Sequence, residues 1–70
     1  MEKMMLHNLL KEKGVTWEEM AMLCGISSSA FRRRMEGTVE FTLGEIEILA
    51  VRLALCESEI RFIFFGEKVS

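Results

Sequence analysis

The chain lacks several features that define other classes of protein. It contains no proline in 70 residues, and half of its residues are hydrophobic. This composition favours helices joined by short connections over a disordered tail or an array of linkers. The longest apolar run near the C-terminus, Phe62 to Phe65, is far shorter than the roughly 20 residues that span a bilayer. We therefore expect one all-α domain over residues 1–70, with no membrane anchor.

Cysteine and histidine are scarce. Cys24 and Cys56 form no CxxC pair, no secretory signal precedes them, and His7 is the only histidine. The sequence thus predicts a cytoplasmic protein with reduced, buried thiols, a solvated His7 and no metal site. Catalysis needs a positioned base or nucleophile in a pocket, so these residues argue against an enzyme, a cofactor or a small-molecule substrate.

Capping and stop residues predict five helices. Thr16-x-x-Glu19 and Thr42-x-x-Glu45 are capping boxes, and Ser27 is a good N-cap. Glycine follows several apolar segments, where it can end a helix. The expected helices cover residues 2–13, from 17 to about 24, from 28 to about 35, from 43 to about 55, and 57–65, with a frayed end over 67–70. The start at Cys56 has the weakest cap, although acids in the first turn suit the helix dipole.

Hydrophobic periodicity gives each of the first four helices a face for the core. The side chains expected on these faces are, in chain order, Met5, Leu6, Leu9, Leu10, Met20, Ala21, Leu23, Cys24, Ala30, Phe31, Met35, Ile46, Leu49, Ala50 and Leu53. The chain shows no internal repeat and no low-complexity stretch.

Residues 16–37, TWEEMAMLCGISSSAFRRRMEG, carry the most specific pattern. Two short helices meet at Gly25, and the small side chain of Ala21 allows them to approach closely, as in a helix-turn-helix. The segment resembles the signature of the phage-repressor and Cro-like (XRE-type) family of bacterial regulators, and the resemblance covers nearly the whole chain. It implies a five-helix, lambda-repressor-like fold, a homodimer on double-stranded DNA with a palindromic operator, and base contacts from the third helix.

The third helix has a polar side that fits this role. At about 100° per residue, Ser28, Ser29, Arg32 and Arg33 fall within an arc of roughly 140°. Arginine can fork onto guanine and serine can bond several base edges, so these four residues are the predicted base-reading set. Arg34 falls on the flank of the buried side. Its stem is expected to pack while its head reaches a phosphate or a carboxylate.

Contacts with the DNA backbone are expected from Thr16, Trp17, Arg34 and Thr38. Trp17 departs from the family, which often has a phosphate-binding glutamine there. Either its indole N–H donates to a phosphate, or its ring covers the core. We favour packing in the core or at its boundary. The net charge is -2, and Glu18, Glu19 and Glu36 lie near the expected DNA face. These acids predict modest affinity with strong salt sensitivity.

The apolar C-terminal segment is expected to serve a dimer. Phe62 and Phe64 point in different directions on a helix, so one face cannot bury all the aromatic rings. Phe62 or Phe65 is the predicted dimer contact, and completion of the core is the competing interpretation. The sequence thus favours a transcriptional regulator, a phage or prophage-type repressor. The alternative is a protein-interaction module on the same scaffold, an antagonist of another regulator.

Overall fold

The computed structural model describes residues 1–66 of the chain. Its elements are α1 (Lys3–Glu12), α2 (Trp17–Cys24), α3 (Ser28–Glu36), α4 (Leu43–Leu53) and α5 (Glu57–Phe65). Within this range there is no strand. The predicted all-helical fold with five helices is confirmed, and the predicted frayed end at 67–70 lies outside the described residues. No helix of this part is long and apolar enough to cross a membrane.

Side-chain caps start three of the helices where the sequence predicts them. The hydroxyl of Thr16 accepts a hydrogen bond from Glu19 N at 3.0 Å, and that of Ser27 accepts one from Ala30 N at 3.0 Å. Thr42 caps α4 in the same way, and the Glu45 carboxylate accepts the reciprocal bond from Thr42 N at 3.0 Å. Each hydroxyl satisfies a backbone donor that has no partner inside its helix.

The predicted capping box at Thr16 is only half correct. No reciprocal bond joins the Glu19 carboxylate to Thr16 N; this carboxylate instead accepts from Arg52 Nε of α4 at 2.8 Å. The charged partner offers a stronger hydrogen bond than the neutral backbone N–H. At α5, by contrast, the weak cap of Cys56 is supported because Glu59 accepts from Cys56 N at 2.9 Å.

Two kinds of residue end the helices. Gly25 and Gly37 close α2 and α3 with φ of 70° and 84°, a conformation that glycine adopts without steric cost. α4 ends at Leu53, slightly earlier than expected, and Ala54 takes the left-handed conformation there with φ of 52°. An alanine in this conformation is strained by its Cβ.

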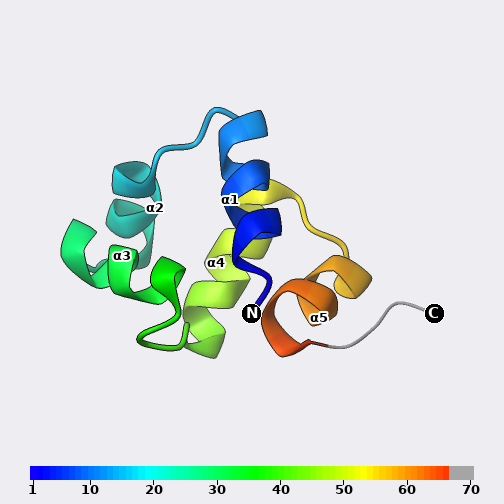
Figure 1. Cartoon of the computed structure of the whole chain (residues 1–70). Helices are drawn as coiled ribbons and strands as arrows, with labels where there is room; N and C mark the ends of the chain where they lie inside the picture. Colours follow the sequence, from blue (N-terminus) through cyan, green and yellow to red (C-terminus); the bar gives the residue numbers. More distant parts are fainter. Residues whose placement is uncertain (67–70) are drawn as a thin grey trace.

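The helices leave α2 and α3 together on one side of the molecule and α5 on the other, with α1 and α4 between them (Figure 1). Side chains from all five helices meet in the centre. Fully or almost fully buried are Leu6, Leu10, Met20, Phe31, Leu49, Leu53 and Ile63. The N-terminal end is joined to α5 by a hydrogen bond from Glu2 N to Ile63 O at 2.7 Å.

Some expectations about burial are wrong. The periodicity predicts Leu23 on the core face of α2, but its side chain is 48% exposed, because it lies on the flank of the helix beside Glu19 rather than with Met20 and Ala21. Cys24 is half-buried and Cys56 is exposed, so the expectation of two buried thiols fails. Cys56 occupies the N-cap of α5, a position outside the core. His7 is exposed, as expected.

Candidate nucleic-acid interface

The connection between α2 and α3 sets the orientation of α3. Gly25 turns the chain, and Ile26 N donates to Ala21 O at 3.0 Å across the turn. Ala21 is 2% exposed, and its small side chain lets the two helices approach closely. Ser27 then caps the new helix at once, so the direction of α3 is fixed by three successive local interactions.

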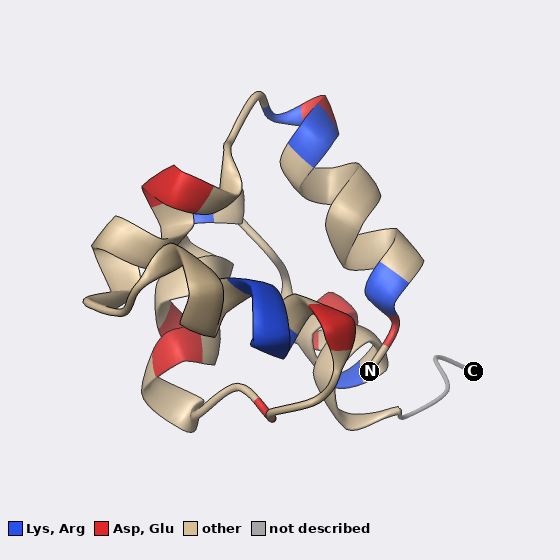
Figure 2. Ribbon diagram, turned by 60° about the vertical axis from the view of Figure 1, so that its left-hand side comes forward, with Lys and Arg blue, Asp and Glu red and all other residues tan. Residues whose placement is uncertain are grey.

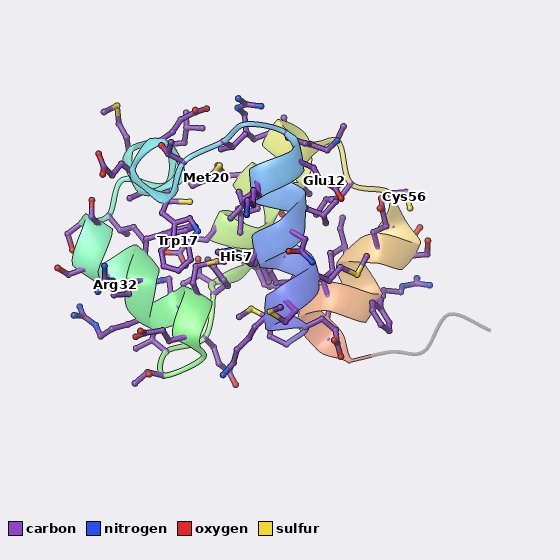
Figure 3. All side chains as sticks on the ribbon, turned by 45° about the horizontal axis from the view of Figure 1, so that its top comes forward. His7, Glu12, Trp17, Met20, Arg32 and Cys56 are labelled. Carbon is purple, nitrogen blue, oxygen red and sulfur yellow. The ribbon has the colours of Figure 1, made fainter. Side chains whose placement is uncertain are left out.

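All four predicted base-reading residues, Ser28, Ser29, Arg32 and Arg33, are exposed. On the opposite side of α3, Phe31 and Met35 are buried at 0% and 3% exposure. The helix is therefore amphipathic as the sequence predicts, with a hydroxyl and guanidinium surface facing solvent. Figure 3 shows Arg32 on the outer side of α3, away from α1.

The four residues share one shallow groove with the first turn of α2. This groove, which we call the α3 groove, has a volume of about 310 Å³ and is lined by Trp17, Glu18, Ser28, Ser29, Arg32 and Arg33. Among the described residues, neither Arg32 nor Arg33 has a side-chain hydrogen bond or ion pair. Their guanidinium groups are thus free to bind an external acceptor. The arginine run forms a single blue block on α3 in Figure 2.

Arg34 is engaged within the protein. Its Nε donates to Glu45 Oε1 at 2.8 Å and a terminal nitrogen donates to Ala30 O at 3.2 Å. Its side chain is only 16% exposed. The sequence leaves phosphate and carboxylate open as partners of Arg34. In the structure its guanidinium group contacts the Glu45 carboxylate and thereby joins α3 to α4.

The electrostatics of Glu45 reflect this arrangement. Burial disfavours its charged form, but hydrogen bonds from Thr42 N and Arg34, together with the charge of Arg34, outweigh burial and hold the pKa of Glu45 below its usual value. Glu45 is therefore ionised at neutral pH. This ion pair removes Arg34 from the set of free cations beside the α3 groove.

Trp17 lies at the boundary between core and groove. Its half-buried ring meets the edge of Phe31 at a centroid distance of 6.2 Å and that of His7 at 5.9 Å, and it lies beside His7 between α1 and α3 in Figure 3. The packing interpretation of Trp17 is thus supported. Because the residue also lines the α3 groove, packing does not prevent a contact from its exposed part.

The other two predicted backbone contacts lie outside the groove. Thr16 is exposed, and its hydroxyl is used to cap α2. Thr38 is exposed in the turn after α3, where its N–H donates to Arg33 O at 3.0 Å. The structure does not bring either threonine to the groove lining. They flank it from the start of α2 and the end of α3.

Of the acids expected near this face, only Glu18 lines the groove. Glu19 is held by Arg52 on α4, and Glu36 is exposed at the end of α3. Figure 2 shows the acidic start of α2 in red. The unfavourable charge at the groove is therefore concentrated at one residue beside two free arginines.

The aromatic residues of α5 divide between core and surface. Ile63 is fully buried, and Phe62 and Phe64 are half-buried against the core. Phe65 is 53% exposed. Phe62 and Phe64 thus pack against the core, and the dimer contact of Phe62 or Phe65 stays a prediction.

Sequence reasoning missed a second exposed apolar surface. On α4, Val51 is 83% exposed and lies on the side opposite the buried Leu49 and Leu53. Leu43, in the first turn of the same helix, is 69% exposed. The signal was available, because these two positions fall eight residues apart and outside the core stripe of α4.

Residues 1–66 contain no group of three or more His, Cys, Asp or Glu side chains arranged to hold a metal ion. Comparisons of the chain with models of protein families, with curated proteins and with solved structures found no match. The interpretation of the α3 groove therefore rests on its own geometry and chemistry.

Proposed function

We propose that the chain is a sequence-specific, DNA-binding transcriptional regulator of the phage-repressor and Cro-like type, with α3 as its reading helix. One observation carries the proposal: α3 presents two unpaired arginines and two serines on one exposed face, on a helix whose opposite side is anchored in the core. A rigid helix with donors on its outer side suits the major groove, where arginine reads guanine O6 and N7.

The neighbouring residues have separate roles in this proposal. In it Thr16, Trp17 and Thr38 contact the phosphate backbone beside α3, while Arg34 acts as a positioning residue through its hydrogen bond to Glu45. Two free arginines per subunit give limited affinity on a chain of net charge -2. A homodimer on a palindromic operator doubles the number of arginines, which is why we propose a dimer. We propose that it acts in the cytoplasm of a bacterial or phage-infected cell.

Selection of bound sites from a random duplex library, followed by anisotropy measurements, tests the proposal. We expect Arg33→Ala to weaken binding by about 5- to 150-fold for each half-site, the equivalent of about 1 to 3 kcal/mol per contact, and to relax the preference at one base pair of each half-site. Arg61→Ala on α5 is the matched control. Unaltered affinity and unaltered base preference in Arg33→Ala would rule out the reading role of α3.

A second candidate is a protein-interaction module that antagonises another regulator. The position of Glu18 in the α3 groove favours it, since a carboxylate there repels phosphate. Salt dependence distinguishes the two functions. Binding to random duplex falls steeply with salt for a DNA reader, because phosphate contacts release counterions, whereas an interaction module shows no measurable duplex binding.

A further inference from the structure

We infer that two copies of this chain associate through the surface between α2 and α4. A groove of about 390 Å³ runs there and is lined by Leu23, Glu47, Ile48, Val51 and Arg52. We call it the α2–α4 groove. It shares no lining residue with the α3 groove, so the proposed interface does not use the reading residues of α3.

The groove exposes apolar side chains that a soluble monomer has no need to expose. Val51 is 83% exposed and Leu23 is 48% exposed, and Ile48 between them is half-buried. The three come from two helices and form one contiguous apolar line rather than scattered single residues. Such patches mark contact surfaces.

The charges beside this line favour a second copy as the partner. Glu47 has no ion-pair partner among residues 1–66. Arg52 forms an ion pair with Glu19 at 2.8 Å, and both of these side chains are 40% exposed. Positions 47 and 52 lie on opposite flanks of the apolar line of α4, displaced by about 7.5 Å along the helix axis.

A surface with one acid and one base on opposite flanks is complementary to itself. A two-fold axis that passes between the two flanks places each Glu47 opposite the partner's Arg52. Ile48 and Val51, which lie between the flanks, then meet their own counterparts near the axis. This is the reciprocal pairing that an isologous interface requires.

The alternative surface on α5 is poorer. Phe62 is already packed against the core, and Phe65 lines a separate hollow that also contains the charged side chains of Lys3, Arg34 and Glu40. That hollow mixes charged and apolar side chains. The α2–α4 groove offers a continuous apolar line instead. Self-association through it is measured without DNA, so a failure of this inference can be distinguished from a failure of the proposed function.

Sedimentation equilibrium of the full chain in the absence of DNA tests this interface. We expect a species of twice the 8.1 kDa monomer mass, and a dissociation constant at least tenfold higher for Val51→Glu, because each copy would bury an unpaired charge at the apolar line. Met4→Glu, at a 72% exposed position on α1, is the control and should leave association unchanged, and Phe65→Glu tests the competing surface on α5. Circular dichroism checks that all three variants stay folded, as expected at exposed positions. A strictly monomeric protein, or dissociation by Phe65→Glu and not by Val51→Glu, overturns the inference.

Charge exchange tests the pairing itself. Glu47→Arg and Arg52→Glu each set like charges against one another in a homodimer, so each variant alone should associate weakly. In an equimolar mixture both cross-pairs become Arg with Glu, and we expect the heterodimer to form at least tenfold more tightly than either homodimer at low salt. A mixture no tighter than its components contradicts the two-fold pairing, whatever the result with Val51→Glu.

Discussion

α2 and α4 begin with the same four-residue pattern and use it differently. Each opens with Thr-x-x-Glu, and each threonine hydroxyl caps its helix. Glu45 returns to Thr42 N and also binds Arg34, whereas Glu19 leaves its own helix start for Arg52. Both acids therefore join a helix of the α2–α3 pair to α4. At Thr42 the capping box is completed because the local backbone N–H and the distant arginine lie within reach of the same carboxylate.

The Arg34–Glu45 and Arg52–Glu19 ion pairs differ most in burial. Loss of the buried pair should therefore have the largest effect on stability. Glu45→Ala leaves Arg34, whose side chain is 16% exposed, without its charged partner and removes half of a capping box. We expect the free energy of unfolding to fall by about 3 kcal/mol, measured by urea denaturation with circular dichroism. Glu40→Ala, an exposed change in the preceding loop, should cost less than about 0.5 kcal/mol. Equal effects of the two variants would remove the special role of Glu45.

Acid should weaken the domain through the same residue. The pKa of Glu45 is lower in the folded protein than its usual value, so unfolding takes up a proton in acid. Its contribution is complete above the usual pKa and is lost as the pH falls through the lower folded pKa. We expect urea midpoints measured between about pH 6 and pH 3 to decline less steeply in Glu45→Gln than in the parent. An unchanged slope in Glu45→Gln would contradict this assignment.

The far ends of the same helices supply the next comparison. α2 ends on Gly25 and α4 on Ala54, both in the left-handed conformation. Ala54→Gly should raise the free energy of unfolding by about 1 kcal/mol, and Gly25→Ala should lower it by a similar amount. No atom lies within 4 Å of a Cβ built at Gly25, so the effect there is one of backbone conformation. Thermal melts that shift in the same direction for both variants would contradict this account.

The smallest effect is expected from the pair on the surface. The side chains of Glu19 and Arg52 are both 40% exposed, and solvent screens such pairs. Glu19→Gln should change the free energy of unfolding by less than about 0.5 kcal/mol, and added salt should erase the difference. If Glu19→Gln lowered the free energy of unfolding as much as Glu45→Ala, burial would not explain the difference between the two ion pairs.

The sequence predicted what depends on neighbours along the chain. The caps at Thr16, Ser27 and Thr42 placed helix starts correctly, and the 3.6-residue period placed Ser28, Ser29, Arg32 and Arg33 on one exposed face. These features rest on interactions within four residues, which a single sequence displays.

Other features depend on residues that only the fold brings together. Glu19 and Arg52 are 33 positions apart, so nothing near Thr16 shows that its capping partner is taken by another helix. Leu23 and Val51 face the same groove from separate helices, and neither segment alone reveals the shared surface. The sequence could not identify the partner of Arg34 for the same reason. A position on the flank of α3 does not show which helix packs beside it.

The hydrogen bond from Glu2 N to Ile63 O has a consequence for folding kinetics. It closes a loop that contains almost the entire described chain, so its entropic cost is met only after the intervening helices have packed. The N-terminal segment should therefore dock against α5 late and undock without unfolding of the rest. In native-state hydrogen exchange, the Glu2 amide should exchange through that partial opening, well before amides of α2 and α3.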